Sequence, residues 1–492
     1  MRTDGFRLSR TVRKFAALRN EPWRRVLHVL LTCVRGRDPG WTAQCRRWGA
    51  CFSAAVLLAV SASSLAQAQA ISPLTPPASP PWNAERVFEP VPYAQLWSHY
   101  PGEKIDPEDT PVSTRQWPGY EPHGIRDHTW MFYPSVTAGG FFDSNVFASN
   151  GDEKSDIAGV INPALRVERL SERNPLTFDT YVKSTKYSHF SSLDQTDARA
   201  RLKGSLYLRE SDTLLYNFQA AYLHEAVGSL SSPLGAISPT PYGYTKEDVT
   251  YWHHHDRLSY SLGASNENYD FGSTKAQNGS TINEDSRDGS VNKLHSRFDY
   301  AFGANFGVFT AIEGNMRDLR GSPTGSLSSQ GLRSLTGVNF NLTHLISGEI
   351  GVGYTRQHFD DPTIGTVSAP AYRALLRWSP TRALDFTLKG EEITTEAVDT
   401  VTSAVRAQAV MLRADYALRR NVVLSALGSY ENDKFVGQDR QDNVYSTMLT
   451  VQYLLNRFSS VGLDYKYINR RSNLTTATYD KHEVGLNVTA HF

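Results

Sequence analysis

One pattern recurs along most of this chain, because apolar and polar residues alternate in runs of about ten from Pro134 to Phe492. The last run, "YDKHEVGLNVTAHF", sets Val484, Leu486 and Val488 against polar neighbours. Successive side chains of a β-strand point to opposite faces, so each run predicts a strand with one apolar and one polar face. Such strands belong either to a soluble sandwich or to a membrane barrel whose polar face lines a wet lumen.

The distribution of charge between the two faces favours the barrel. The runs "LTFDTYVKST", "ARARLKGSLYLRE", "LHSRFDYAF", "LDFTLKGE" and "VGLDYKYINR" all keep their charged residues on one face. An Arg or Lys that faced lipid at the midplane would cost about 2–4 kcal/mol, so we expect these residues to face the lumen. The predicted lumen-facing residues are Arg199, Arg201, Lys203, Arg297, Asp299, Arg373, Arg377, Asp385, Lys389, Glu391, Asp464 and Lys466. A wall of mixed sign is typical of a hydrated channel for neutral or weakly charged polar solutes.

Turn-forming residues divide the runs into hairpins whose connections alternate between short and long. Short turns are predicted at Glu172–Pro175, Glu210–Thr213, His255–Arg257, Ser379–Arg382, Arg419–Asn421 and Asn456–Phe458. Long polar loops are predicted near 148–155, 230–245, 272–290, 320–330, 360–367 and 437–441. Tight periplasmic turns and long external loops are typical of an outer-membrane barrel. The fold class is therefore all-β, a transmembrane antiparallel up-and-down barrel of about 18 strands, and a count of about 16 also fits.

Composition excludes two other classes of protein. The chain has 492 residues, a net charge of +1 and a mean hydropathy of -0.42. No apolar run reaches the roughly 18 residues that a membrane-spanning helix requires. The balanced charge also argues against a nucleic-acid binder that relies on bulk positive charge.

The first 130 residues carry different signals. In "CRRWGACFSAAVLLAVSASSLAQAQA", two arginines precede an apolar stretch and a small-residue exit, so we predict that residues 1–70 hold an N-terminal extension and a secretory signal cleaved near Ala70. All three cysteines lie in this part, which leaves the mature protein without a thiol. Residues 71–130 are proline-rich and predict a periplasmic segment with little core of its own. The barrel is predicted to span 131–492.

Catalytic and metal sites have little support in the sequence. In "YWHHHDR", His253 and His255 share a strand face and could hold zinc or copper with Asp256. The stretch precedes a short turn, however, where polar and aromatic residues form the membrane-interface girdle. No glycine-rich phosphate loop, HExxH, CxxC or GxSxG element occurs in the mature chain. We therefore predict no catalytic residue, cofactor or metal.

The start of the barrel, "GYEPHGIRDHTWMFYPSVTAGGFFDSNVFA", resembles the putative β-barrel porin 2 family of bacterial outer-membrane proteins. In that family a Gly-Ile/Val-Arg step leads into a first strand with an Asp-x-Asn-hydrophobic-aromatic motif, which corresponds here to Asp143, Asn145 and Phe147. Asp and Asn near a strand end often bond local backbone and fix a turn, and a ligand contact is the alternative. The resemblance implies a porin-like barrel, and a related branch accompanies exopolysaccharide synthesis and export.

The predicted function is a porin-like barrel that conducts polar solutes across the bacterial outer membrane, with polysaccharide export as the sharper version. A non-conducting structural or assembly barrel, plugged by its loops or by residues 71–130, is the alternative, and an outer-membrane enzyme is a weaker one. Expected partners are outer-membrane lipid, the transported polar solute or polysaccharide, and the barrel-insertion machinery. That machinery reads a final aromatic residue, here Phe492. We expect no nucleic-acid partner.

Overall fold

The fold is that of a computed structural model, which describes residues 112, 115, 117–171, 173–230, 232–303, 305–321, 326, 328–343, 345–395 and 404–492. All described residues belong to one compact unit of the chain. The predicted signal peptide, its cleavage site and most of the proline-rich segment therefore lie outside the described residues. No helix in the described ranges is long and apolar enough to cross a membrane, a result that has no bearing on crossing by strands.

Regular structure in the described ranges is almost entirely β. The strands are β1 (Ile125–Asp127), β2 (Trp130–Asp143), β3 (Asp156–Arg169), β4 (Leu176–Tyr187), β5 (Gln195–Tyr207), β6 (Asp212–Glu225), β7 (Thr240–His255), β8 (Leu258–Phe271), β9 (Ser273–Lys275), β10 (Thr281–Asn283), β11 (Gly289–Gly303), β12 (Phe306–Leu319), β13 (Ser329–Thr343), β14 (Ile346–Phe359), β15 (Thr366–Thr381), β16 (Leu384–Thr395), β17 (Ala404–Arg419), β18 (Val422–Val436), β19 (Gln441–Asn456), β20 (Ser459–Ser472) and β21 (Tyr479–His491). Short 3-10 turns are η3 (Ser191–Leu193), η4 (Asp285–Arg287) and η5 (Thr475–Ala477).

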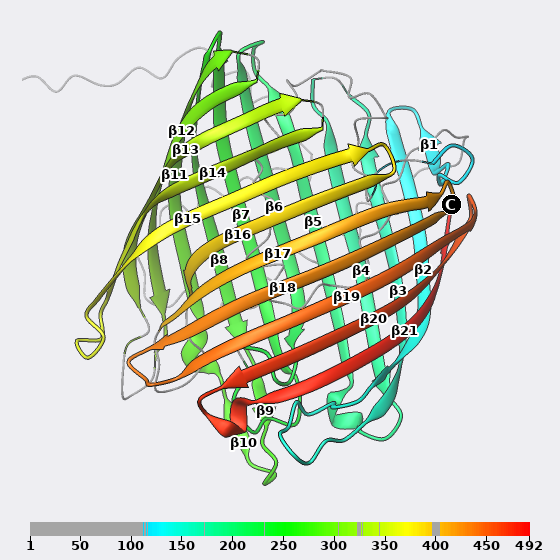
Figure 1. The fold of residues 1–492 in the computed structure, drawn as a ribbon, viewed down its shortest axis with the longest axis vertical. Coiled ribbons are helices and arrows are strands. Elements are labelled where there is room, and N and C mark those ends of the chain that lie inside the picture. Colours follow the sequence, from blue (N-terminus) through cyan, green and yellow to red (C-terminus); the bar gives the residue numbers. More distant parts are fainter. Residues whose placement is uncertain are drawn as a thin grey trace, which may run out of the picture. The chain divides into compact units, whose positions relative to one another are not determined.

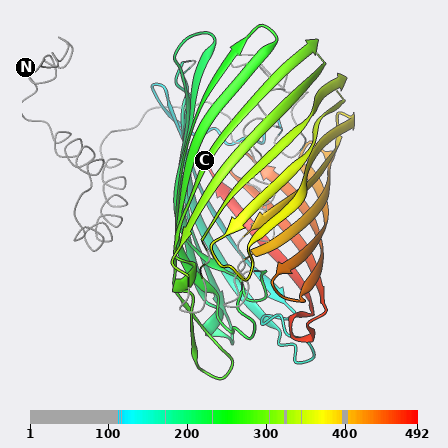
Figure 2. The same cartoon turned by 90° about the vertical axis from the view of Figure 1, so that its left-hand side faces the viewer.

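Eighteen of these strands form the wall of a closed antiparallel barrel (Figures 1 and 2), a count that refers to the described ranges. Each strand pairs with its neighbours in the sequence, and β21 pairs with β2 from Ser135↔His491 to Asp143↔Glu483. The predicted 18-stranded up-and-down barrel is confirmed. The short β1 adds a hairpin to the start of β2, and β9 and β10 form a separate ribbon in the β8–β11 connection.

The connections follow the predicted alternation of short and long. All six predicted short turns link consecutive strands, and they lie at the end of the barrel where β2 begins and β21 ends. Two further short connections, between β11 and β12 and between β13 and β14, were not predicted. The loops at 188–194 and 473–478 were also missed. The barrel strands hold 12 to 16 residues, more than the roughly 9–11 that span a bilayer, so they extend beyond it.

The outer face carries an apolar band between two rows of aromatic residues, as a membrane barrel requires. Exposed aliphatic residues such as Leu294, Val352 and Leu486 form the band, with 60%, 66% and 56% of their surface accessible. The aromatic row nearer the short turns includes Tyr300, Phe306, Trp378, Tyr416 and Tyr453, and the row nearer the long loops includes Tyr222, Tyr354, Tyr430 and Tyr445. The outer surface is thus built to contact lipid along its whole circumference.

Candidate functional site in the barrel interior

The charged residues of the wall strands lie mainly on the face opposite the apolar band. Arg297 is 4% exposed, whereas its neighbour Phe298 on the outer face is 55% exposed. The Arg297 guanidinium on β11 also lies 2.7 Å from Glu349 on β14, and strands three places apart reach each other only across the concave side of the wall. By the same alternation, the structure places all twelve predicted lumen-facing residues on the inner face.

One group of inner-face charges is packed away from solvent. Arg297 Nε and Nη2 donate to both carboxylate oxygens of Asp299 at 2.7–2.9 Å, and the same guanidinium contacts Glu349. Asn339 donates to Asp299 at 3.2 Å, and the guanidinium lies 4.1 Å from the ring centre of Phe309. We call these five residues the buried network. Their mutual bonds satisfy charges that burial would otherwise penalise.

The adjoining strands β13, β15 and β16 carry further cross-strand pairs. Arg333 donates to Glu391 at 2.9 Å, and Arg373 lies 3.6 Å from the same carboxylate. Nearer the short turns, Arg377 lies 3.7 Å from Asp385. Lys389 occupies the same inward row of β16, between these two carboxylates in the sequence. The four cations and two carboxylates named here leave this part of the wall with more positive than negative charge, although three of the cations have a carboxylate partner.

A second group, on β3, β4 and β5, is more open. Arg166 and Arg201 share the carboxylate of Asp179, at 2.8 Å and 3.1 Å, with about a quarter of each arginine side chain exposed. Arg199 and Lys203 lie on either side of Arg201 along the inward row of β5. We call Arg166, Asp179, Arg199, Arg201 and Lys203 the open cluster. Arg166 also lies 3.7 Å from Glu168 on β3, so two carboxylates among four cations leave this part of the wall with a surplus of positive charge.

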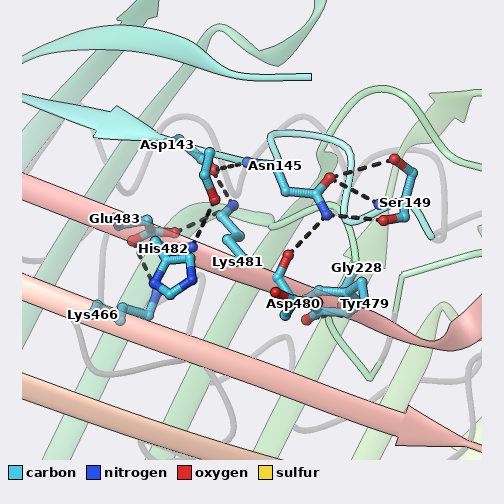
Figure 3. Close-up of polar contacts among 11 residues, drawn as sticks. Asp143, Asn145, Ser149, Gly228, Lys466, Tyr479, Asp480, Lys481, His482 and Glu483 are labelled. Atoms are coloured by element: carbon cyan, nitrogen blue, oxygen red, sulfur yellow. Dashed lines mark hydrogen bonds and ion pairs between the residues drawn. The ribbon is translucent and has the colours of Figure 1, made fainter. Parts of the chain in front are cut away.

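The junction of the first and last strands holds a chain of alternating charges (Figure 3). Asp143 on β2 is fully buried and lies 2.6 Å from the ammonium of Lys481 on β21. Lys481 lies 3.3 Å from Glu483, which in turn lies 3.2 Å from Lys466 on β20. These ion pairs tie three strands together where the barrel closes. Asp464, one step further along β20, accepts hydrogen bonds from Thr450 and Asn487, at 2.8 Å and 2.9 Å.

The Asp-x-Asn motif makes the turn that leaves β2 and also contacts the last strand. The backbone N–H of Asn145 donates to the Asp143 carboxylate at 3.0 Å. The Asn145 side chain exchanges hydrogen bonds with the backbone of Ser149. Asn145 Nδ2 also donates to the carbonyl of Asp480 at 2.9 Å (Figure 3). Phe147 packs edge-on against Phe190 in the next long loop. The bonds to Asp143 and Ser149 fix the local turn. The bond to Asp480 joins this turn to the start of β21, where the barrel closes.

The long connection between β6 and β7, residues 226–239, folds into the barrel rather than away from it; we call it the crossing loop. Leu230 is 5% exposed and packs with Val405 on β17 and Phe435 on β18. In the ring of eighteen strands, β6 and β17 are nine places apart, on opposite sides. The crossing loop therefore spans the lumen near the long-loop end.

Two further contacts fix the crossing loop to the last strands. The Tyr479 hydroxyl donates to the carbonyl of Gly228 at 2.9 Å, and Arg470 donates to the carbonyl of Ser229. Gly228 has a φ of 76°, and a Cβ there would lie 2.1 Å from the Cβ of Ala148, so only glycine fits. The sequence analysis placed a polar loop here and did not predict its inward fold. The available signal was a set of apolar residues, Leu230, Leu234 and Ile237, within a segment expected to be solvated.

At the opposite mouth, the chain before β1 contacts the inner wall. The amide of Val112, a fully buried residue, donates to Asp385, and the Arg115 guanidinium donates to the carbonyl of Arg382 in the β15–β16 turn. This is the point at which the predicted periplasmic segment meets the barrel.

The three consecutive histidines divide between the two faces as predicted. His253, on the outer face, lies 2.7 Å from Asp212 and packs beside Tyr260. His254 points inward and stacks on Trp252, while His255 is exposed next to Asp256. Among the residues that the structure describes, no three His, Cys, Asp or Glu side chains converge as a group that could hold a metal. His253 lies near the short-turn end of β7, beside Tyr260 and Asp212.

A model of the family described as "Putative beta-barrel porin 2" matches residues 117–492. The chain belongs to this family. Membership places the protein among the porin-like β-barrels of the bacterial outer membrane. The match begins just before β1 and includes the whole barrel, together with the Asp-x-Asn motif that the sequence analysis used.

Several solved structures of outer-membrane proteins are similar to this chain in fold. OccAB3 of Acinetobacter baumannii has 11% sequence identity and a TM-score of 0.40, with 74% of this chain and 99% of that chain covered. OpdQ of Pseudomonas aeruginosa has 13% identity and a TM-score of 0.39, with 73% and 97% covered. The siderophore receptor PiuA of Acinetobacter baumannii has 8% identity and a TM-score of 0.43, with 78% and 85% covered. No curated protein matches the chain.

Proposed function

We propose that this barrel conducts small polar solutes across the outer membrane through a lumen narrowed by the crossing loop. Two observations together support the proposal. The inner wall carries many charged side chains, and the crossing loop starts at β6 but packs against β17 and β18 on the opposite side of the barrel. Charged side chains on both β5 and β16 supply a hydrated path, and the crossing loop limits the size of what passes. Because cations and anions are both numerous along the wall, we expect weak ion selectivity.

The test is conductance of the purified mature protein in a planar lipid bilayer. We expect stable single channels with weak ion selectivity. Replacing Ser229–Ile237 with two glycines should raise single-channel conductance, because it removes the loop from the lumen. A matched control replaces Asp361–Ile364 of the β14–β15 loop in the same way and should leave conductance unchanged. Heat-modifiable mobility in gels verifies that each variant is a folded barrel.

A non-conducting structural barrel is the competing proposal, and the contact of Val112 with Asp385 favours it. This contact places part of the preceding chain against the inner wall at the short-turn mouth. Silent bilayers for the full mature protein, and again after deletion of residues 71–116, would contradict conduction and support the structural barrel. Channels that open only after the deletion would instead show that the segment closes a conducting barrel.

The polysaccharide-export version is a finer proposal that rests on family resemblance. The crossing loop favours small solutes over a polymer, because a chain of sugars needs an unobstructed lumen. Neighbouring genes for glycosyltransferases and export proteins would support the polymer, and a channel that widens only on loop removal would count against it. The channel proposal is also preferred to an outer-membrane enzyme, since the family to which the chain belongs is one of porin-like barrels.

Two proposals concern maturation. We propose cleavage near Ala70, so that N-terminal sequencing of the membrane-extracted protein should begin near Ile71. Retention of Cys51 would contradict it. We also propose that the insertion machinery reads Phe492, which is 59% exposed at the end of the outer row and donates its amide to Pro134. Phe492→Ala should lower the yield of inserted barrel, whereas a conservative Phe492→Tyr should not.

A further inference from the structure

Four aromatic side chains lie together on the inner face of β7 and β8, near the long-loop end of the barrel. Tyr242 stacks with Phe271 at a centroid distance of 5.3 Å, and Tyr244 packs against Tyr269 at 5.1 Å. Tyr269 and Phe271 are parallel within 7° at 6.0 Å. We call this group the aromatic platform.

The strand alternation places the aromatic platform inside the barrel. Thr245 and Glu247, which follow the β7 tyrosines, are exposed on the outer face, whereas Trp252 lies on the inner face with 7% of its surface exposed. Tyr242 and Tyr244 share the parity of Trp252, and the β7–β8 register sets them opposite Phe271 and Tyr269. The outer aromatic residues meet the membrane interface, but these inner residues have no such role.

An arginine holds the platform from one side. The Arg287 guanidinium lies 3.7 Å from the ring centre of Phe271. It forms two bonds to Glu225, at 2.8 Å and 2.9 Å, and a third to Glu284 at 3.3 Å. Phe271 is only 5% exposed, while the three tyrosines are half-buried. The platform is therefore a fixed group of rings on the lumen side, of which the three tyrosines remain partly accessible.

Both positively and negatively charged side chains, which can donate and accept hydrogen bonds, border the platform. Glu267 accepts a hydrogen bond from the Tyr269 hydroxyl at 2.9 Å. Lys293 and Lys246 lie 3.2 Å and 3.6 Å from the same carboxylate. Flat aromatic faces attract the polarised C–H groups of a pyranose ring, and mixed donors and acceptors at the rim suit its hydroxyls. A charged aromatic acid would instead require surplus charge of one sign.

We propose that the aromatic platform binds the pyranose ring of a saccharide as it passes the crossing loop. The inference rests on the proposed conduction and names its substrate class. Binding needs to be weak, since a solute must leave the site as readily as it enters. The platform lies on β7 and β8, the strands that follow the crossing loop in the chain.

The experiment is single-channel recording with maltohexaose, cellohexaose or an α-1,6-linked glucan hexasaccharide added to the bath. We expect at least one of the three to cause resolved, reversible blockades. Tyr244→Ala and Tyr269→Ala should each shorten the blockade dwell time by about fivefold, the effect of removing one aromatic contact. Tyr300→Ala is the matched control, because this tyrosine lies on the outer face with 42% of its surface exposed, and it should leave dwell times unchanged.

The outcomes separate this inference from the proposed function. Open channels without blockade by any of the three sugars would overturn the platform proposal and leave conduction standing. Silent bilayers would refute conduction, and titration calorimetry of the same sugars with detergent-purified protein would then decide whether the platform binds. Blockade by benzoate that depends on Tyr244 and Tyr269, with none by sugars, would assign the platform to aromatic acids instead.

Discussion

The buried network and the open cluster use the same residue types on the same inner face, yet they differ in what surrounds them. In the buried network, Arg297 has two carboxylate partners, and all three side chains are at most 8% exposed. In the open cluster, Arg166 and Arg201 share Asp179, Arg166 also lies 3.7 Å from Glu168, and each arginine keeps about a quarter of its side chain exposed. The comparison teaches that inward charges can serve two purposes, holding the wall together and meeting the solute, and that the exposure of the charged side chains distinguishes the two.

The largest expected effect is on stability in the buried network. Arg297→Met leaves Asp299 and Glu349 as buried carboxylates without their counter-charge, which should lower the free energy of unfolding by about 3–5 kcal/mol. Urea unfolding in lipid vesicles measures it. The triple variant Arg297→Met, Asp299→Leu, Glu349→Met should recover most of the loss, because it removes the charges together. An unfolding free energy for Arg297→Met equal to that of the wild type would erase the distinction between the two groups.

The second effect separates the groups by conduction. Arg201→Met should change the free energy of unfolding by no more than about 1 kcal/mol, since a solvated pair contributes little. The double variant Arg201→Glu, Lys203→Glu should nevertheless shift the reversal potential in a salt gradient toward cation selectivity. A matched control on the outer rim, Lys186→Glu, should leave selectivity unaltered. If the double variant conducts with wild-type selectivity, the open cluster does not face the permeation path.

A third, smaller effect concerns salt. The Debye length falls from about 10 Å at 0.1 M to about 3 Å at 1 M, so the selectivity change caused by the double variant should shrink at high salt. The stability loss of Arg297→Met should persist, because buried pairs are screened much less. Recording selectivity and unfolding at both salt concentrations tests the two halves of the comparison. Equal salt sensitivity would mean that solvent reaches both groups alike.

The smallest effect is expected at a solvated carboxylate that belongs to neither group. In the β14–β15 loop, Asp361 accepts hydrogen bonds from the hydroxyl and amide of Thr363, which lower the pKa of its carboxyl. A depressed pKa means that the loop bonds are present at neutral pH and are lost as the pH falls through that pKa. Thr363→Ala should raise the pKa toward the ordinary value, as measured by NMR titration of the carboxyl carbon.

The sequence predicted the barrel well because its signal is local. Alternation sets the face of every residue in a strand, and turn residues such as those at Ser379–Arg382 mark most hairpins. The short connection between β13 and β14 was missed because the sequence "HLI" contains no residue with a strong turn preference. Membership of a family was also visible, since the Asp-x-Asn motif is short and continuous in the chain.

Contacts between distant parts of the chain could not be predicted in the same way. The inward face of Arg297 followed from alternation, but its bond to Glu349 depends on barrel curvature. The crossing loop was invisible for a similar reason, since Leu230 meets Val405 and Phe435 only once the wall has closed. The aromatic platform falls between these cases. Alternation along the strand predicts that Tyr242 and Tyr244 share one face. Their packing with Tyr269 could not be predicted, because it depends on the register between β7 and β8.

The anchoring of the crossing loop has a consequence for the order of assembly. Its bonds join Gly228 to Tyr479 and Ser229 to Arg470, across sequence separations of 251 and 241 residues. Contacts between residues so far apart in the sequence form late in folding, because the chain between them must first be arranged. The loop therefore gains its final position only after β20 and β21 have joined the sheet. An incompletely inserted chain would hold an undivided lumen, so narrowing of the passage coincides with completion of the wall.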